Sequence, residues 1–192
     1  MRVAGFVLVG GRSSRMGRDK ARLPVESRLL VEAVADKMSG VAESVALIGE
    51  ADRYCDLSLD RFDDLRPCLG PLAGIETALN LARGELNLIV ACDMPDLDSQ
   101  WLRQLVAHAA ENSSRCVISR DATGVIHPLC GVWHARCSIP VRAALDHQRL
   151  RVFGIIEELN ADVLSMNRRL LNINTPAEWN AWQDRDAVAD GR

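Results

Sequence analysis

The chain has 192 residues, 48% of them hydrophobic and 26% charged, which is typical of one globular domain with a full core and excludes a disordered chain. Its formal net charge of -3 argues against a nucleic-acid-binding protein, although a local basic pocket for one phosphate ligand is compatible with it. The apolar stretch from Val3 to Val9 is too short to span a membrane, so we expect no membrane partner.

Short apolar runs alternate with longer amphipathic segments, as in repeated β-α-β units. The first half of the chain predicts these elements in order: a strand over 2–9, a helix over 29–38, strands over 44–48 and 61–65, a helix from the 70–74 loop to 82, and a strand over 86–91. The last of these strands is almost entirely apolar, which places it in the centre of the sheet, buried on both faces.

The second half continues the alternation. Its predicted elements are a helix capped by Asp98 that reaches 110, strands over 116–119 and 129–134, helices over 139–147 and 152–159, a strand over 162–165, and a helix from Pro176 to 182. We therefore predict a three-layer α/β/α sandwich with a mostly parallel sheet: one domain over 1–186, followed by a polar tail over 187–192. Such sheets bind ligands at the carboxyl ends of their strands.

The first strand runs into a loop rich in glycine and basic residues, Gly10-Gly11-Arg12-Ser13-Ser14-Arg15-Met16-Gly17-Arg18-Asp19-Lys20. It matches neither a P-loop nor a dinucleotide-binding fingerprint. Adjacent glycines nevertheless let backbone N–H groups approach a ligand, and the arginines and lysine supply donors for phosphate oxygens. We predict an anion site here; the alternative is a solvated basic loop.

Four further segments stand out, and all lie where an element is expected to begin or end. They are Asp64-Leu65-Arg66-Pro67 with Gly70-Pro71-Leu72-Ala73-Gly74, then Cys92-Asp93-Met94-Pro95, His127-Pro128-Leu129, and Asn172-Ile173-Asn174-Thr175-Pro176. With the first loop, these segments resemble the molybdenum cofactor guanylyltransferases in order and approximate spacing. That family belongs to the wider group of Rossmann-like nucleotidyltransferases with a nucleoside-diphospho-sugar transferase fold.

The resemblance implies transfer of GMP from GTP, with Mg²⁺, to the terminal phosphate of molybdopterin or of the molybdenum cofactor. Pyrophosphate leaves and a guanine dinucleotide cofactor forms, and molybdoenzyme maturation proteins are expected as partners. The implied nucleotide-binding residues are Leu8, Val9, Gly10, Gly11, Lys20, Asp64 and Asp93. Arg15, Lys20 and Asp93 are implied as catalytic, with Asp93 as the metal ligand, and Asn172 and Asn174 lie on the acceptor side.

The chemistry is compatible with these roles. A phosphate monoester is already ionised at neutral pH, so the enzyme has to supply positioning and charge neutralisation rather than a general base. Each residue also has a structural alternative. Asp93 can be a cap, Asp64 a turn carboxylate, and Asn172 and Asn174 the stabilisers of the turn before the last helix. For His127 we expect only a packed loop histidine.

The sequence departs from the family at two positions. Cys68 stands where relatives often have glycine, and Ile48-Gly49-Glu50 replaces a segment in which relatives tend to carry asparagine. The rival functions are a molybdopterin cytidylyltransferase, a sugar-phosphate nucleotidyltransferase, and a non-catalytic module that presents the cofactor. No cysteine spacing matches a zinc or haem site, which predicts free thiols in a reducing cytoplasm.

Overall fold

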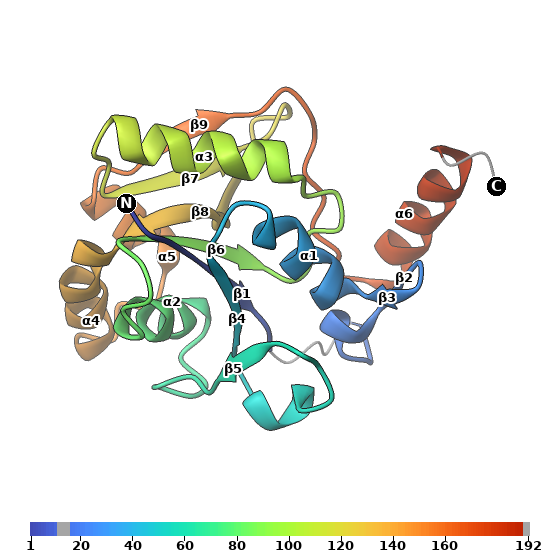
Figure 1. The fold of residues 1–192 in the computed structure, drawn as a ribbon, viewed down its shortest axis with the longest axis horizontal. Helices are drawn as coiled ribbons and strands as arrows, with labels where there is room; N and C mark the ends of the chain where they lie inside the picture. The colour runs from blue at the N-terminus through green and yellow to red at the C-terminus, as the bar shows by residue number, and fades with distance from the viewer. Residues whose placement is uncertain (11–15, 190–192) are drawn as a thin grey trace.

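The computed structural model describes residues 1–10 and 16–189 (Figure 1). Its main sheet has seven strands in the order β5-β4-β1-β6-β8-β7-β9. These strands are β1 (Val3–Leu8), β4 (Ser44–Ile48), β5 (Asp60–Phe62), β6 (Leu86–Ala91), β7 (Cys116–Arg120), β8 (Ile126–His134) and β9 (Asp162–Ser165). Only β8 runs antiparallel to its neighbours. The predicted mostly parallel sheet is confirmed.

Helices cover both faces of this sheet and enclose two separate apolar cores. Residues of α1 (Leu30–Ser39), α3 (Ser99–Glu111) and α6 (Pro176–Ala189) contribute to one core. The other core contains residues of α2 (Pro71–Asn80), α4 (Ser138–Asp146) and α5 (Val152–Glu158). Strand β6 supplies both cores, because Leu88 and Val90 enter the first and Ile89 the second. This alternation confirms the three-layer architecture and the central position of β6.

Four short elements were not predicted, because none is long enough to show a hydrophobic period. They are the 3-10 turns η1 (Lys20–Arg22), η2 (Ala51–Tyr54) and η3 (Ala135–Cys137), and a hairpin of β2 (Pro24–Val25) and β3 (Arg28–Leu29). Asp98, in contrast, caps α3 as expected, since its carboxylate accepts a hydrogen bond from the Trp101 N–H at 2.9 Å.

Three predicted boundaries were wrong. Strand β5 ends at Phe62 rather than 65, because Asp63 turns away to accept a hydrogen bond from the Ala51 N–H at 2.8 Å. Strand β8 begins at Ile126 rather than 129, and Pro128 lies within its irregular register with β7, where its missing N–H is tolerated. Helix α6 continues to Ala189, not 182. Among the described residues, no helix is long and apolar enough to cross a bilayer.

Candidate active site

The carboxyl ends of β1, β4 and β6 meet at one edge of the sheet. The Val9 N–H donates to the Ile48 carbonyl at 2.8 Å, and the Cys92 N–H donates to the Leu8 carbonyl at 3.1 Å. A Cβ added to Gly49 would lie 2.0 Å from the Val9 carbonyl oxygen, so only glycine permits this close approach. The segment Ile48-Gly49-Glu50 therefore has a structural role that its departure from the family pattern did not suggest.

Four predicted site residues come together at this edge. The Lys20 ammonium lies 3.1 Å from Asp93 Oδ2 and donates to Asn174 Oδ1 at 2.9 Å. The Asn172 amide donates to Asp93 Oδ1 at 3.2 Å. The side chains of Lys20 and Asp93 are only 17% and 14% exposed. The cluster joins the first loop, the end of β6 and the segment before α6. Its cation, Lys20, and its carboxylate, Asp93, lie side by side and are both partly buried.

The start of α6 does not depend on the two asparagine side chains. The Thr175 hydroxyl accepts a hydrogen bond from the Glu178 N–H, and the Glu178 carboxylate accepts from the Thr175 N–H at 2.9 Å, which is a capping box. That carboxylate also accepts from the Asn174 N–H at 2.8 Å. These backbone donors lower the pKa of Glu178. The capping box leaves the Asn174 side chain available to Lys20.

Asp64 lies beside the end of β1. A Cβ built on Gly74 of α2 would be 3.1 Å from the Leu8 side chain and 3.5 Å from Asp64 Oδ1, so these three residues are neighbours. Asp64 Oδ1 is buried without a hydrogen-bond partner among the described residues. Burial, together with the charges of Asp63 and Glu50, raises the pKa of Asp64. A buried acceptor with no donor is what a ligand N–H can satisfy.

A cavity of about 470 Å³ adjoins the cluster on the side of Asn172 and α6. Asp121 and His127, both nearly inaccessible to solvent, form part of its wall. Burial alone would raise the pKa of Asp121, but hydrogen bonds from Thr123, Leu170 and Val125 outweigh it and lower that pKa. His127 Nε2 lies 3.4 Å from Asp121 Oδ2 without a hydrogen bond. The expected packed histidine thus stands at a cavity wall.

Of the remaining predicted residues, some lie in the described part of the chain and others do not. Leu8, Val9 and Gly10 lie at the end of β1, and Gly10 has φ +111°, a conformation that suits glycine. Gly11 and Arg15 lie outside the described residues, so their assignment to the nucleotide site stays a prediction. Cys68 is exposed with φ +67°, in the left-handed region that glycine adopts without strain.

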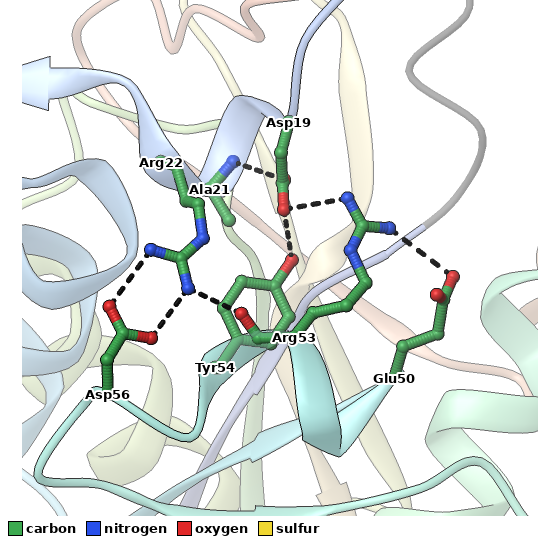
Figure 2. A network of polar contacts seen from close by, with 7 residues as sticks. All are labelled: Asp19, Ala21, Arg22, Glu50, Arg53, Tyr54 and Asp56. Atoms are coloured by element: carbon green, nitrogen blue, oxygen red, sulfur yellow. Dashed lines mark hydrogen bonds and ion pairs between the residues drawn. The ribbon is translucent and has the colours of Figure 1, made fainter.

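Residues that the sequence did not single out contact Asp19 and Arg22, which flank the turn that carries Lys20 (Figure 2). Asp19 accepts hydrogen bonds from Arg53 and Tyr54, both of η2, and Arg22 pairs with Asp56. No recognisable motif covers residues 50–56, so no signal in one sequence pointed to them. Their contacts place η2 directly against the turn that carries Lys20.

Comparison with known proteins identifies the family. The profile of the MobA-like NTP transferase domain matches residues 5–162. A probable molybdenum cofactor guanylyltransferase from Carboxydothermus hydrogenoformans is 31% identical over 90% of this chain and 91% of its own length.

Solved structures share the fold. The molybdopterin-guanine dinucleotide biosynthesis protein A from Archaeoglobus fulgidus has a TM-score of 0.80 at 20% identity, covering 98% of this chain and all of its own. The Mycobacterium tuberculosis protein Rv0371c, in a complex with manganese, has a TM-score of 0.68 at 17% identity, covering 96% and 99% of the two chains. The chain therefore belongs to the MobA-like NTP transferase family and is a nucleotidyltransferase of molybdenum cofactor biosynthesis.

Proposed function

We propose that this enzyme transfers GMP from GTP to the terminal phosphate of molybdopterin or of the molybdenum cofactor. The observation that carries the proposal is the cluster of Lys20, Asp93, Asn172 and Asn174 at the carboxyl ends of β1 and β6. It places a cation for the triphosphate next to a carboxylate and beside a cavity large enough for a second small molecule.

The donor nucleotide lies along the end of β1. Lys20 contacts the triphosphate, and the exposed backbone of Gly10 permits close approach of the ligand. The Leu8 and Val9 segment contacts the base or ribose. The unpartnered Asp64 Oδ1 accepts an N–H from the base, and guanine offers adjacent ring and amino N–H donors that suit a carboxylate. The raised pKa of Asp64 falls when such donors bind, because they favour its charged form.

A divalent cation fits at Asp93, and Mg²⁺ is the ion we propose. Mg²⁺ is usually held by one or two carboxylates together with substrate phosphates, so a single carboxylate at a strand end is a sufficient protein contribution. No group of three or more His, Cys, Asp or Glu side chains suited to a metal occurs in the described part of the chain, which agrees with a site completed by the triphosphate. When bound, the ion neutralises charge that develops on the triphosphate.

The acceptor occupies the cavity next to Asn172, with its terminal phosphate directed at the cluster. An oxygen of that phosphate attacks the α-phosphorus of GTP, the bond from this phosphorus to the bridging oxygen breaks, and pyrophosphate leaves. The residues contribute orientation and charge: Lys20 holds the triphosphate, and Asn172 and Asn174 orient Asp93 and Lys20. No proton needs to be removed, since the attacking phosphate is already ionised.

Nucleotide binding is tested first by thermal melting with GTP, CTP, ATP and UTP, each with and without Mg²⁺. A ligand at about a hundred times its Kd adds about 2.7 kcal/mol, which raises the Tm of a domain of this size by several degrees. A larger shift with GTP than with the other nucleotides supports the proposal. A larger shift with CTP refutes GTP as the donor.

Turnover is tested by pyrophosphate release from GTP and molybdopterin, because a non-catalytic module releases none. Lys20→Ala should weaken GTP binding far more than Cys68→Gly does, and equal binding by the two variants would contradict the role of Lys20.

We also place the reaction in the cytoplasm, since all six cysteines are free. Molybdoenzyme maturation proteins as partners stay a prediction.

A further inference from the structure

Lys20 stands on a turn with few bonds of its own. The element η1 is three residues long, and its internal support consists of hydrogen bonds from the Arg22 and Leu23 N–H groups to the Asp19 and Lys20 carbonyls, at 3.2 and 3.1 Å. Such a short 3-10 turn has little stability by itself. The Lys20 ammonium is bonded to Asp93 and Asn174, and the position of the backbone that carries it depends on contacts that η1 makes with the rest of the molecule.

Asp19 provides the first of these contacts (Figure 2). Its Oδ1 caps the turn by accepting from the Ala21 N–H at 3.0 Å. Its Oδ2 accepts from the Arg53 guanidinium and from the Tyr54 hydroxyl, both at 2.9 Å. The Asp19 side chain is 14% exposed and Tyr54 is fully buried. One carboxylate thus joins the N-terminal end of η1 to η2, in a setting where hydrogen bonds to a charged group are strong.

Arg22 provides a second contact at the other end of the same turn. It donates to both Asp56 carboxylate oxygens, at 3.0 and 2.6 Å, and to the Arg53 carbonyl, and its guanidinium lies 5.6 Å from the centre of the Tyr54 ring. The pair with Asp56 is exposed to solvent and contributes little by itself. Asp19 is therefore the stronger of the two attachments.

The same element, η2, is also bonded to the segment that follows β5. The Ala51 N–H donates to Asp63 Oδ1 at 2.8 Å, and Asp63 is followed directly by Asp64. The Gly49 N–H donates to the Phe62 carbonyl at 3.0 Å. Consequently, η2 lies between the turn that carries Lys20 and the segment that carries Asp64, and it fixes one relative to the other.

We propose that Asp19, Arg53 and Tyr54 are positioning residues that hold the Lys20 ammonium in place to receive the triphosphate. This inference rests on the proposed function, which places Lys20 at the triphosphate. Tyr54 is the decisive member, because a side chain with no exposed surface cannot itself touch the nucleotide. Any effect of its hydroxyl on GTP binding must be transmitted through Asp19 and the turn.

The test is a double-mutant cycle on Mg-GTP binding, measured by calorimetry with Tyr54→Phe, Lys20→Ala and the double variant. The aromatic ring is retained in Tyr54→Phe, and only the hydroxyl and its bond to Asp19 are lost. We expect Tyr54→Phe to bind GTP about tenfold more weakly and to have no further effect in the Lys20→Ala background. The matched control is Ser114→Ala, which also removes a hydroxyl bonded to a carboxylate, that of Asp162, near the opposite end of the sheet; it should bind GTP normally.

The outcomes separate the two proposals. If Lys20→Ala binds GTP normally, the proposed nucleotide site is wrong and this inference falls with it. If Lys20→Ala loses binding but Tyr54→Phe does not, or if Tyr54→Phe loses as much in both backgrounds, only the positioning role is refuted. Should Tyr54→Phe melt too low to assay, Arg53→Ala replaces it in the cycle, since its removal leaves no large buried cavity. Because the Arg53 side chain is 41% exposed and is not kept from the nucleotide as Tyr54 is, only a loss that disappears in the Lys20→Ala background counts for positioning.

Discussion

Asp93 can be tested by a substitution that keeps its shape. In Asp93→Asn, the amide oxygen can still accept from Lys20 or from Asn172, but the negative charge 3.1 Å from the Lys20 ammonium is gone. Lys20 keeps Asn174 as an acceptor. A charge-assisted bond in a partly buried setting becomes a bond to a neutral acceptor, which lowers the free energy of unfolding by about 1 kcal/mol. The Tm then falls by about 2 to 4 °C, so the protein stays folded.

The effect on activity should be much larger, because Asp93 is the proposed protein ligand of the cation. We expect pyrophosphate release from GTP and molybdopterin to fall by about a hundredfold or more at saturating Mg²⁺. Asp98→Asn is the matched control: asparagine caps a helix as well as aspartate does, and this change removes only the ion pair with Arg168. If Asp93→Asn kept its rate and its Mg²⁺ dependence within about threefold of the control, the metal assignment would be refuted.

Three further substitutions test other parts of the molecule. Asp64→Asn should weaken GTP binding more than ATP binding in calorimetry, because it replaces a charged acceptor for the base, and equal losses would contradict its contact with guanine. Cys68→Gly should raise the free energy of unfolding by about 0.5 to 1 kcal/mol in urea titrations, since it relieves a φ of +67° at an exposed site; a loss of stability would show that no strain is present. The pKa of Asp121 is lowered in the folded protein, so its stabilisation is complete above the unfolded pKa of about 3.9 and is lost as the pH falls through that range toward the folded pKa. Asp121→Asn should therefore be less stable near neutral pH and should lose less stability than the parent between about pH 5 and pH 3, and parallel pH profiles would contradict this.

The sequence was informative where function depends on residues at strand ends. Lys20 and Asp93 could be placed at one edge of the sheet because they follow predicted strands, whereas the family resemblance supplied Asn172 and Asn174; the structure brings these side chains together. The central strand β6 was equally clear from its unbroken apolar run. The strand and the position of the site follow from local composition and from a topology rule, and the residue roles follow from the resemblance.

Features that depend on pairing between distant segments were not predictable. Tyr54 looked like an ordinary residue of an unassigned stretch, and only the approach of η2 to η1 gives its hydroxyl a partner. Pro128 argued against a strand until the irregular register of β8 accommodated it. The need for glycine at position 49 arises from the Val9 carbonyl, forty residues earlier.

The contact between Lys20 and Asn174 joins groups 154 positions apart, and it bears on how the protein is made. During synthesis the first loop and β1 leave the ribosome well before Asn174 does. A nascent chain can therefore complete its sheet up to β9 while the active site is still open on one side. Incomplete products that end before residue 172 would lack Asn172 and Asn174, which lie on the acceptor side of the site. Such products should be inactive, not partly active.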